Sequence, residues 1–262
     1  MISFYLKKNF CDGWDNFLFV VITNAITLAL AVGIWFAISF TITTPVVSLA
    51  IFVLGICLLT VYSCSLSNCC ARIADFKSVS IKSVFANCKN VLKTALALGI
   101  FISILVFIVV FAIPFYFNMN AFSGNFLWLI LGSLLMWFVL ITAFALLWFF
   151  PLYSQIGGGF LKNLKKSYIV MFDNIFFTMF LAIYVIFLLV FSLLLASFAP
   201  GVSGVLLATN NALRLRLYKY DWMEANPYEV KMKRRIPWDE LTAEDNEKVG
   251  DRSFKSFLFP WK

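Results

Sequence analysis

This 262-residue sequence has few charged residues, no histidine and no CxxC cysteine pair. Charged residues make up 13% of it and hydrophobic residues 62%, against about 25% and about 45–50% in a typical soluble domain. This composition excludes a soluble globular enzyme, a disordered chain and a small disulfide-linked domain. The absence of histidine removes the commonest acid–base residue and metal ligand. An integral membrane protein is the class that remains.

Three long stretches without Asp, Glu, Lys or Arg indicate where the chain crosses the membrane. Residues 16–71, 94–161 and 174–213 contain none of the four. A spanning helix needs about 20 apolar residues, so each stretch is long enough for two crossings joined by a turn. The predicted spans lie near 17–40, 46–68, 94–117, 126–150, 175–198 and 202–217. The sixth is weaker, because it contains Asn210, Asn211, Arg214 and Arg216, and it is either a short tilted span or a re-entrant segment.

Basic residues between the paired spans predict the orientation. Residues 72–93 carry five basic side chains and one acidic one, residues 162–173 carry three lysines, and the three outer turns carry no Lys or Arg. Because short cationic loops stay cytoplasmic, we expect both termini to lie on the cytoplasmic side of the membrane. Residues 1–217 then form the transmembrane domain and residues 218–262 a cytoplasmic tail.

The distribution of charge also predicts a lipid partner. Residues 1–217 hold 12 basic and 4 acidic side chains, and the rest of the chain holds 9 of each. The whole excess of positive charge therefore lies beside the membrane, where it favours anionic lipids at the cytoplasmic face. This arrangement does not predict binding to a nucleic acid.

Three similar stretches precede the three pairs of spans and predict a repeated unit. In each, an amphipathic segment with basic residues leads to an asparagine directly before the apolar run, namely Asn16, Asn90 and Asn174. We expect each asparagine to accept a hydrogen bond from the first N–H groups of the new helix. The predicted fold is an all-α polytopic membrane helix bundle of about six spans, built as three helical hairpins, each preceded by an amphipathic interfacial helix, with a cytoplasmic C-terminal extension. The alternative is similarity by composition alone, since inner loops of most multi-span proteins are basic and amphipathic.

Candidate functional residues are few. Asn24, Asn210 and Asn211 are polar groups within the predicted spans, and they either line a path for a solute or bond across helices. No charged residue lies deep in a span to couple transport to an ion, and the six cysteines form no CxxC pair. We therefore predict no catalytic, cofactor-binding or metal-binding residue, and no cofactor. The aromatic terminus is predicted to dock on a partner or at the membrane interface through Phe257, Phe259, Pro260 and Trp261.

Several short segments together resemble the YesL-like family of bacterial integral membrane proteins over roughly residues 5–220. The segments that carry the resemblance are Lys8-Asn9-Phe10, Trp14-Asp15-Asn16-Phe17, Thr44-Pro45-Val46-Val47, Asn90-Val91-Leu92-Lys93 and Phe149-Phe150-Pro151-Leu152-Tyr153. The resemblance implies an association with ABC-type sugar importers, whose genes lie near those of the family, and it brings no catalytic residues. The tail beyond about residue 220 departs from the short-ended pattern of the family.

The functional prediction joins these observations. It is an inner-membrane accessory or scaffold protein without enzymatic activity, which assists an importer of carbohydrates or other small solutes, with ABC-type importer components as the implied partners. The alternative is a carrier or permease subunit for a neutral solute, with Asn24, Asn210 and Asn211 along its path. A membrane enzyme is a third and weaker alternative, because acid–base groups occur only near the membrane surface.

Overall fold

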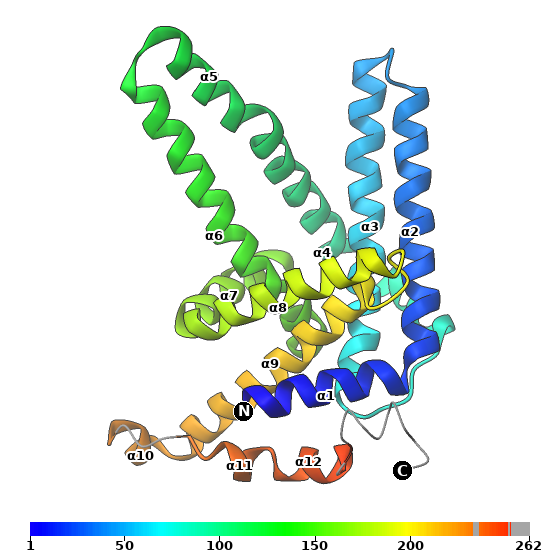
Figure 1. Cartoon of the computed structure of the whole chain (residues 1–262), viewed down its shortest axis with the longest axis vertical. Coiled ribbons are helices and arrows are strands. Elements are labelled where there is room, and N and C mark those ends of the chain that lie inside the picture. The colour runs from blue at the N-terminus through cyan, green and yellow to red at the C-terminus, as the bar shows by residue number, and fades with distance from the viewer. Residues whose placement is uncertain (233–235, 251, 253–262) are drawn as a thin grey trace.

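The computed structural model describes residues 1–232, 236–250 and 252, and within these residues it is helical without strands (Figure 1). The helices are α1 (Ile2–Asp15), α2 (Phe17–Phe40), α3 (Pro45–Ala74), α4 (Ile81–Phe107), the π-helical turn η1 (Ile108–Ala112), α5 (Ile113–Ser123), α6 (Phe126–Ile156), α7 (Phe160–Asp173), α8 (Ile175–Leu194), α9 (Gly201–Ala225), α10 (Pro227–Lys231), α11 (Trp238–Leu241) and α12 (Ala243–Val249).

Within the described residues, five helical segments are long and apolar enough to cross a membrane, which indicates a multi-pass membrane protein. They are α2, α3, the continuous segment Ile81–Ser123 that joins α4 to α5, α6, and α8. Two hairpins made from these segments, α2 with α3 and α5 with α6, project from the same end of the molecule and diverge toward their turns (Figure 1). Pro45 begins α3 at a position where its missing N–H costs no hydrogen bond. Gly124 ends α5 in the left-handed conformation that glycine adopts readily, with φ of 67°.

The outer parts of both hairpins carry large apolar side chains that the rest of the chain does not cover. Trp35 in α2 is 62% exposed, Phe40 at its end 84%, and Phe122 near the turn of the second hairpin 94%. In water, such surfaces would aggregate. In a bilayer, lipid hydrocarbon covers them, as expected for spans with lipid as their solvent.

α3 and α4 pack against each other more extensively than any other two helices of the described residues. Gly99 allows their close approach, because a Cβ atom there would lie 2.7 Å from the Cα of Cys57. Thr60 of α3 donates a hydrogen bond of 3.0 Å to the carbonyl of Ala95 in α4. Small residues and hydroxyl bonds are the usual means of holding spans together when lipid offers no hydrophobic driving force.

α1 and α7 are separate helices that precede α2 and α8, as predicted, whereas the corresponding segment before the second hairpin continues into α4 without a break. The predicted role of the asparagines is wrong. Asn16 and Asn174 separate the paired helices, but each side chain donates to the carbonyl four residues earlier, Asp12 or Val170, instead of capping the following helix. Asn90 lies inside α4. The amide side chains thus close the ends of α1 and α7.

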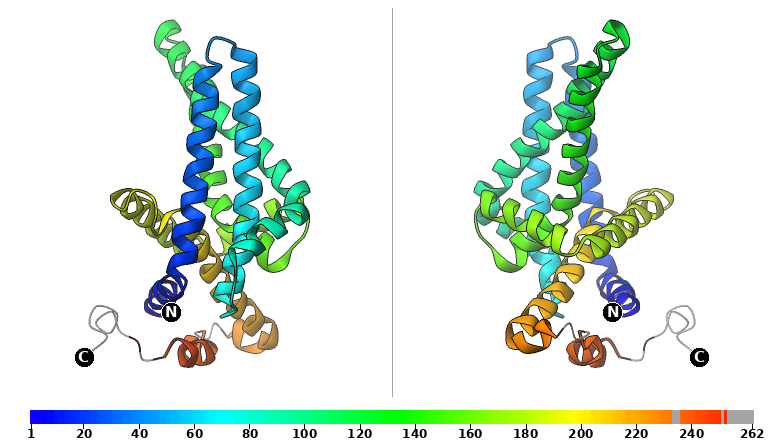
Figure 2. Two further views of the ribbon diagram at one scale, coloured as in Figure 1. Left: turned by 90° about the vertical axis from the view of Figure 1, so that its right-hand side faces the viewer. Right: turned by 90° about the vertical axis from the view of Figure 1, so that its left-hand side faces the viewer.

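The third pair of helices differs from the first two. The loop from α8 to α9 lies beside the first third of α2, well below the turns of the other hairpins (Figure 1). α9 extends from Gly201 to Ala225, beyond the predicted 202–217, and its first sixteen residues are almost wholly buried against other helices. It is not among the five membrane-length segments, so a sixth crossing stays a prediction. Figure 2 shows α1 and α10–α12 at the end of the molecule opposite the hairpin turns.

Candidate functional site

α9 is the element around which the buried polar side chains gather. It contacts α1, α2, α3, α6 and α8, and Asn210 and Asn211 lie on it with side chains that are 0% and 1% exposed. Asn24, the third predicted candidate, lies on α2 and is 2% exposed. The three asparagines do not converge on one site. Each bonds to a different set of neighbours.

Asn24 joins α2 to the beginning of α9. Its amide nitrogen donates to the carbonyls of Phe198, at 3.0 Å, and Pro200, at 2.7 Å. Its amide oxygen accepts a hydrogen bond of 2.9 Å from the backbone N–H of Ser203 in the first turn of α9. A helix N-terminus leaves its first N–H groups without intrahelical partners. Asn24 satisfies one of these and fixes the loop before them, which is a structural role.

Asn210 joins α9 to α3 and α6. Its amide nitrogen donates to the hydroxyl of Ser67, at 3.1 Å, and to the carbonyl of Leu206, at 2.8 Å. Its amide oxygen accepts from the Ser154 hydroxyl, at 2.9 Å, and from the Gln155 amide, at 3.0 Å. All of the hydrogen-bonding capacity of this buried amide is therefore used, with three bonds to α3 and α6 and one within α9.

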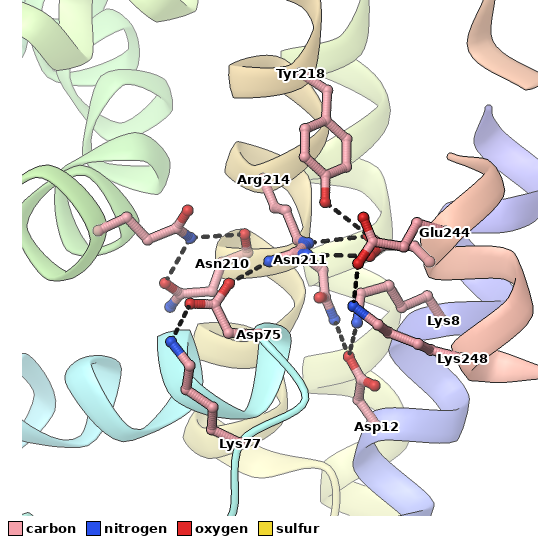
Figure 3. Close-up of polar contacts among 12 residues, drawn as sticks. Lys8, Asp12, Asp75, Lys77, Asn210, Asn211, Arg214, Tyr218, Glu244 and Lys248 are labelled. Atoms are coloured by element: carbon pink, nitrogen blue, oxygen red, sulfur yellow. Dashed lines mark hydrogen bonds and ion pairs between the residues drawn. The ribbon is translucent and has the colours of Figure 1, made fainter. Parts of the chain in front are cut away.

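Asn211 joins α9 to α1 (Figure 3). Its amide nitrogen donates to the carboxylate of Asp12, at 3.0 Å, and to the side-chain oxygen of Asn9, at 3.3 Å. Lys8 forms an ion pair of 2.9 Å with the same carboxylate. The amide oxygen of Asn211 is buried without a hydrogen-bond partner among the described residues. The cluster thus lacks one hydrogen-bond donor, the one that this oxygen would accept from.

The Lys8–Asp12 pair is buried, which the sequence did not lead us to expect. The two side chains are 2% and 7% exposed, and the ammonium group lies 3.6 Å from the centre of the Phe76 ring. Burial lowers the pKa of Lys8 and raises the pKa of Asp12, while the opposite charge of each partner counteracts both shifts. Removal of one partner would leave an uncompensated buried charge, which is the costly case.

Arg214 joins α9 to α12 and to the end of α3. Its Nε and Nη2 donate to the two carboxylate oxygens of Asp245, at 2.9 and 3.0 Å, and its Nη1 pairs with Asp75 (Figure 3). Tyr218 donates a hydrogen bond of 3.1 Å to Asp245. The two-pronged geometry orders both partners. It holds α12, which belongs to the predicted cytoplasmic tail, against the helical body.

Arg216 is the second buried arginine of α9 and has no carboxylate within ion-pair distance among the described residues. It is 6% exposed, donates to the side-chain oxygen of Asn174 at 3.2 Å, and lies 3.9 Å from the centre of the Phe177 ring. Its Nε is buried without a hydrogen-bond partner in the part of the chain that the structure describes. The aromatic ring stabilises the guanidinium charge in place of an anion.

A polar pocket of about 350 Å³ lies beside this cluster, between α3, α6 and α9. Asn68 and Arg72 of α3, Ser154 and Gln155 of α6, and Asp221 of α9 are among its lining residues. Ser154 and Gln155 are the same side chains that bond to Asn210. The pocket offers hydrogen-bond donors and acceptors together with charged groups of both signs, so it is suited to a small polar molecule and not to an apolar one.

No three His, Cys, Asp or Glu side chains in the described part of the chain come together as a group that could hold a metal ion. All six cysteines are free, and five of them are buried. Burial of this kind is typical of cysteines that pack as small apolar side chains.

The predicted docking residues Phe257, Phe259, Pro260 and Trp261 lie outside the described residues. The preceding part of the tail contacts the body of the protein. Lys7 donates to the carbonyl of Gly250, at 2.7 Å, and Arg252 pairs with Asp15, at 2.7 Å. Both contacts are on α1, so the tail reaches the end of this helix before the aromatic segment begins.

Sequence reasoning missed the charged members of the cluster. Lys8 and Asp12 are four residues apart on α1, as are Arg214 and Tyr218 on α9, and this spacing is the one signal that places each pair on a common helix face. It does not reveal that the face is buried. Asp245 was hidden for another reason, since it is 31 residues from Arg214 and nothing local links the two.

Comparison with protein families, with curated proteins and with solved structures finds no match to this chain. The resemblance to the YesL-like family therefore stays a prediction, and the functional argument depends on the geometry of the chain itself.

Proposed function

We propose that this protein is an accessory or scaffold component of a bacterial inner membrane, not a carrier in its own right. The observation that supports this proposal is the use of the three candidate asparagines. Asn24, Asn210 and Asn211 bond between helices instead of facing a common path. The outer halves of the two hairpins, in contrast, present large apolar side chains that other membrane helices or lipids can cover.

The partner in this proposal is the membrane part of a small-solute importer of the ABC type. This part of the proposal depends on the resemblance to the YesL-like family. Both termini and the polar cluster around α9 are proposed to lie on the cytoplasmic side, where the excess of basic residues contacts anionic lipids.

Cross-linking in native membranes tests the partnership. The tagged full-length protein is compared with a chain that ends at residue 252 and with one that ends at residue 219. The first truncation keeps the Arg214–Asp245 and Asp15–Arg252 pairs, and the second removes both. We expect importer subunits to be enriched with the full-length chain over an unrelated multi-pass protein. Loss on truncation at 252 would assign docking to the aromatic terminus, and loss only at 219 would assign it to residues 220–252, which include α10, α11 and α12. Equal recovery of subunits with the unrelated protein would contradict the proposal.

Labelling of introduced cysteines tests the orientation. A membrane-impermeant maleimide added to intact cells is expected to modify Ser123→Cys, at the exposed turn between α5 and α6, and not Lys82→Cys, in the exposed first turn of α4. The opposite pattern would invert the topology. Lysed cells provide the control, because both positions then become accessible.

A carrier for a neutral solute is the second candidate, and the polar pocket between α3, α6 and α9 favours it. Uptake of a panel of labelled sugars into proteoliposomes that contain only this chain decides between the two functions. Saturable uptake that falls with Gln155→Leu, but not with the exposed Ser39→Ala of α2, would establish the carrier and overturn the scaffold proposal. We expect no uptake above that of empty liposomes.

A further inference from the structure

An apolar cleft of about 830 Å³ lies between α1, the first turn of α2, α8 and the beginning of α9. Figure 1 shows the arrangement, with α8 passing above α1 and with α2 at the end of both. The lining residues include Gly13 of α1, Phe17 of α2, Phe187 and Leu188 of α8, and Leu207 of α9. Its volume is within the usual range of ligand-binding clefts, about 300–1,000 Å³.

The cleft opens onto the surface that the bilayer covers. Two of its walls, α2 and α8, are among the five membrane-length segments. On α8, Ile183, Phe187 and Phe191 line the cleft and are also 66%, 59% and 44% exposed, so the lining is continuous with the outward apolar face of this helix. Water does not fill an apolar cleft in the hydrocarbon region of a membrane, so the available solvent there is lipid chains.

One end of the cleft carries a polar pair. Asn9 of α1 donates a hydrogen bond of 2.9 Å to the hydroxyl oxygen of Tyr184 on α8, and both residues line the cleft. Among the described residues no group accepts the hydroxyl hydrogen of Tyr184. The cleft therefore combines a long apolar wall with one hydrogen-bond donor at its end, and this donor matches an ester carbonyl at the head of an acyl chain.

We propose that this cleft binds one acyl chain of a bilayer phospholipid, with its ester carbonyl accepting a hydrogen bond from Tyr184. The chain enters sideways from the lipid that surrounds α8 and lies along the apolar side of α1. The bound lipid fills the space between α1 and α8. The packing of α1 against α8 therefore depends on which lipids the membrane contains. This proposal is independent of the importer partnership.

Gly13 provides a sharp test, because a Cβ atom at this position meets no atom within 4 Å. Gly13→Leu adds a side chain at the wall of the cleft, at a position where its Cβ atom has room, and also replaces a helical glycine by a better helix former. Gly33→Leu on α2 is the matched control, since Gly33 is equally unobstructed and does not line the cleft. Thermal unfolding of both variants in detergent verifies that they fold.

Photolabelling in nanodiscs measures how often a phospholipid acyl chain occupies the cleft. The probe is a phosphatidylcholine with a diazirine on one acyl chain, and adducts are mapped by mass spectrometry. We expect adducts on Phe187 and Leu188 in the natural protein and in Gly33→Leu. In Gly13→Leu we expect about tenfold fewer, equivalent to a loss of roughly 1.4 kcal/mol of binding. Equal labelling of the cleft in Gly13→Leu, or labelling spread evenly over all exposed spans, would overturn the proposal.

A second comparison tests the polar end. Tyr184→Phe removes the hydroxyl but keeps the ring that stacks on Phe180. It should reduce labelling by the ester-linked probe about threefold to tenfold, the effect of one hydrogen bond, and leave labelling by an ether-linked probe unchanged. If the cleft is labelled only after removal of residues 253–262, or only in monomers separated from a dimer, its occupant is the terminal segment or a second copy, and the proposal fails.

Discussion

The outer halves of the two hairpins and the cluster around α9 follow opposite rules. In the hairpins, apolar side chains such as Phe40 and Phe122 point outward and are more than four-fifths exposed. Around α9, polar and charged side chains such as Lys8, Asp12 and Asn210 are almost fully buried. The comparison shows that the surrounding solvent, lipid or water, determines which side chains are exposed and which are buried. Where lipid surrounds the chain, apolar groups cost nothing outside, and polar groups are stable only where other polar groups meet them.

α1 shows this inversion within a single helix. Its apolar stripe of Leu6, Phe10 and Trp14, which continues to Phe17 at the start of α2, is the side that would pack inward in a soluble protein. In the structure, Trp14 and Phe17 are 52% and 47% exposed, whereas the polar side around Lys8 is buried against α9. The helix is amphipathic, as predicted, but the face that holds it to the body combines the polar side chains Lys8, Asn9 and Asp12 with the apolar side chains Phe4, Tyr5 and Cys11.

The largest expected effect comes from breaking the Lys8–Asp12 pair. Asp12→Ala should lower the free energy of unfolding by about 3–5 kcal/mol, because it leaves the Lys8 charge buried and uncompensated. Thermal or denaturant unfolding in a mild detergent measures the loss. The double variant Lys8→Met with Asp12→Leu is the control and should lose much less. A single variant as stable as the natural protein would mean that the pair is not buried.

A charge introduced into the α2–α3 hairpin tests whether lipid covers its exposed apolar side chains. Leu54 lies near the middle of the predicted membrane segment of α3 and is 68% exposed. Leu54→Arg should cost about 2.5–3.5 kcal/mol in membrane insertion of this span, while Leu54→Ile should have no measurable effect. Insertion efficiency of the segment in a translocon assay gives the value. Equal insertion of the two variants would show that Leu54 does not face hydrocarbon.

Asn24→Leu is expected to have an intermediate effect. It removes three hydrogen bonds and leaves the Ser203 N–H and the Phe198 carbonyl without partners, whereas the Pro200 carbonyl keeps its bond from the Gly204 N–H, at a cost of about 1–3 kcal/mol. The matched control is Ser39→Ala, which removes an exposed hydroxyl that bonds only within α2. Hydrogen exchange of the first turn of α9 should increase in the first variant and not in the second. Unchanged exchange in both would contradict the anchoring role of Asn24.

The smallest expected effect is a pH-dependent one at Asp173. Partial burial disfavours the charged form, but hydrogen bonds from Lys219 and Tyr220 outweigh it and lower the pKa of Asp173. A lowered folded-state pKa adds stability above the ordinary value near 3.8, and this stability is lost as pH falls through the lowered pKa. Because the side chain is 46% exposed, Asp173→Asn should cost at most about 1 kcal/mol at pH 7. The difference between variant and natural protein should disappear in acid; a difference that grows in acid would reverse the sign of the shift.

Much of the helical layout follows from local features. The charge-free stretches and the turn at Thr41–Pro45 predict the hairpin of α2 and α3, and the helix α2 covers the predicted 17–40. The apolar runs alone determine these segments, because a long apolar helix has few alternatives in a membrane. The α8–α9 pair was harder to predict. Its loop is held by Asn24, which is more than 170 residues away in the sequence.

The candidate site was only partly predictable. Asn24, Asn210 and Asn211 were found because an amide within an apolar run is conspicuous. Their partners were not, since Ser67, Ser154 and Asp12 belong to three other helices. The aromatic residues 257–261 lie outside the described residues, so docking through them stays a prediction.

Composition and charge spacing alone determined that the chain has lipid as its main surroundings and which stretches form its long apolar helices, because these properties depend only on runs of neighbouring residues. Only the tertiary structure decided which polar groups meet around α9, that α12 is held against the body, and that a cleft opens between α1 and α8. These features depend on contacts between residues far apart in the sequence, and no local pattern encodes a distance in space.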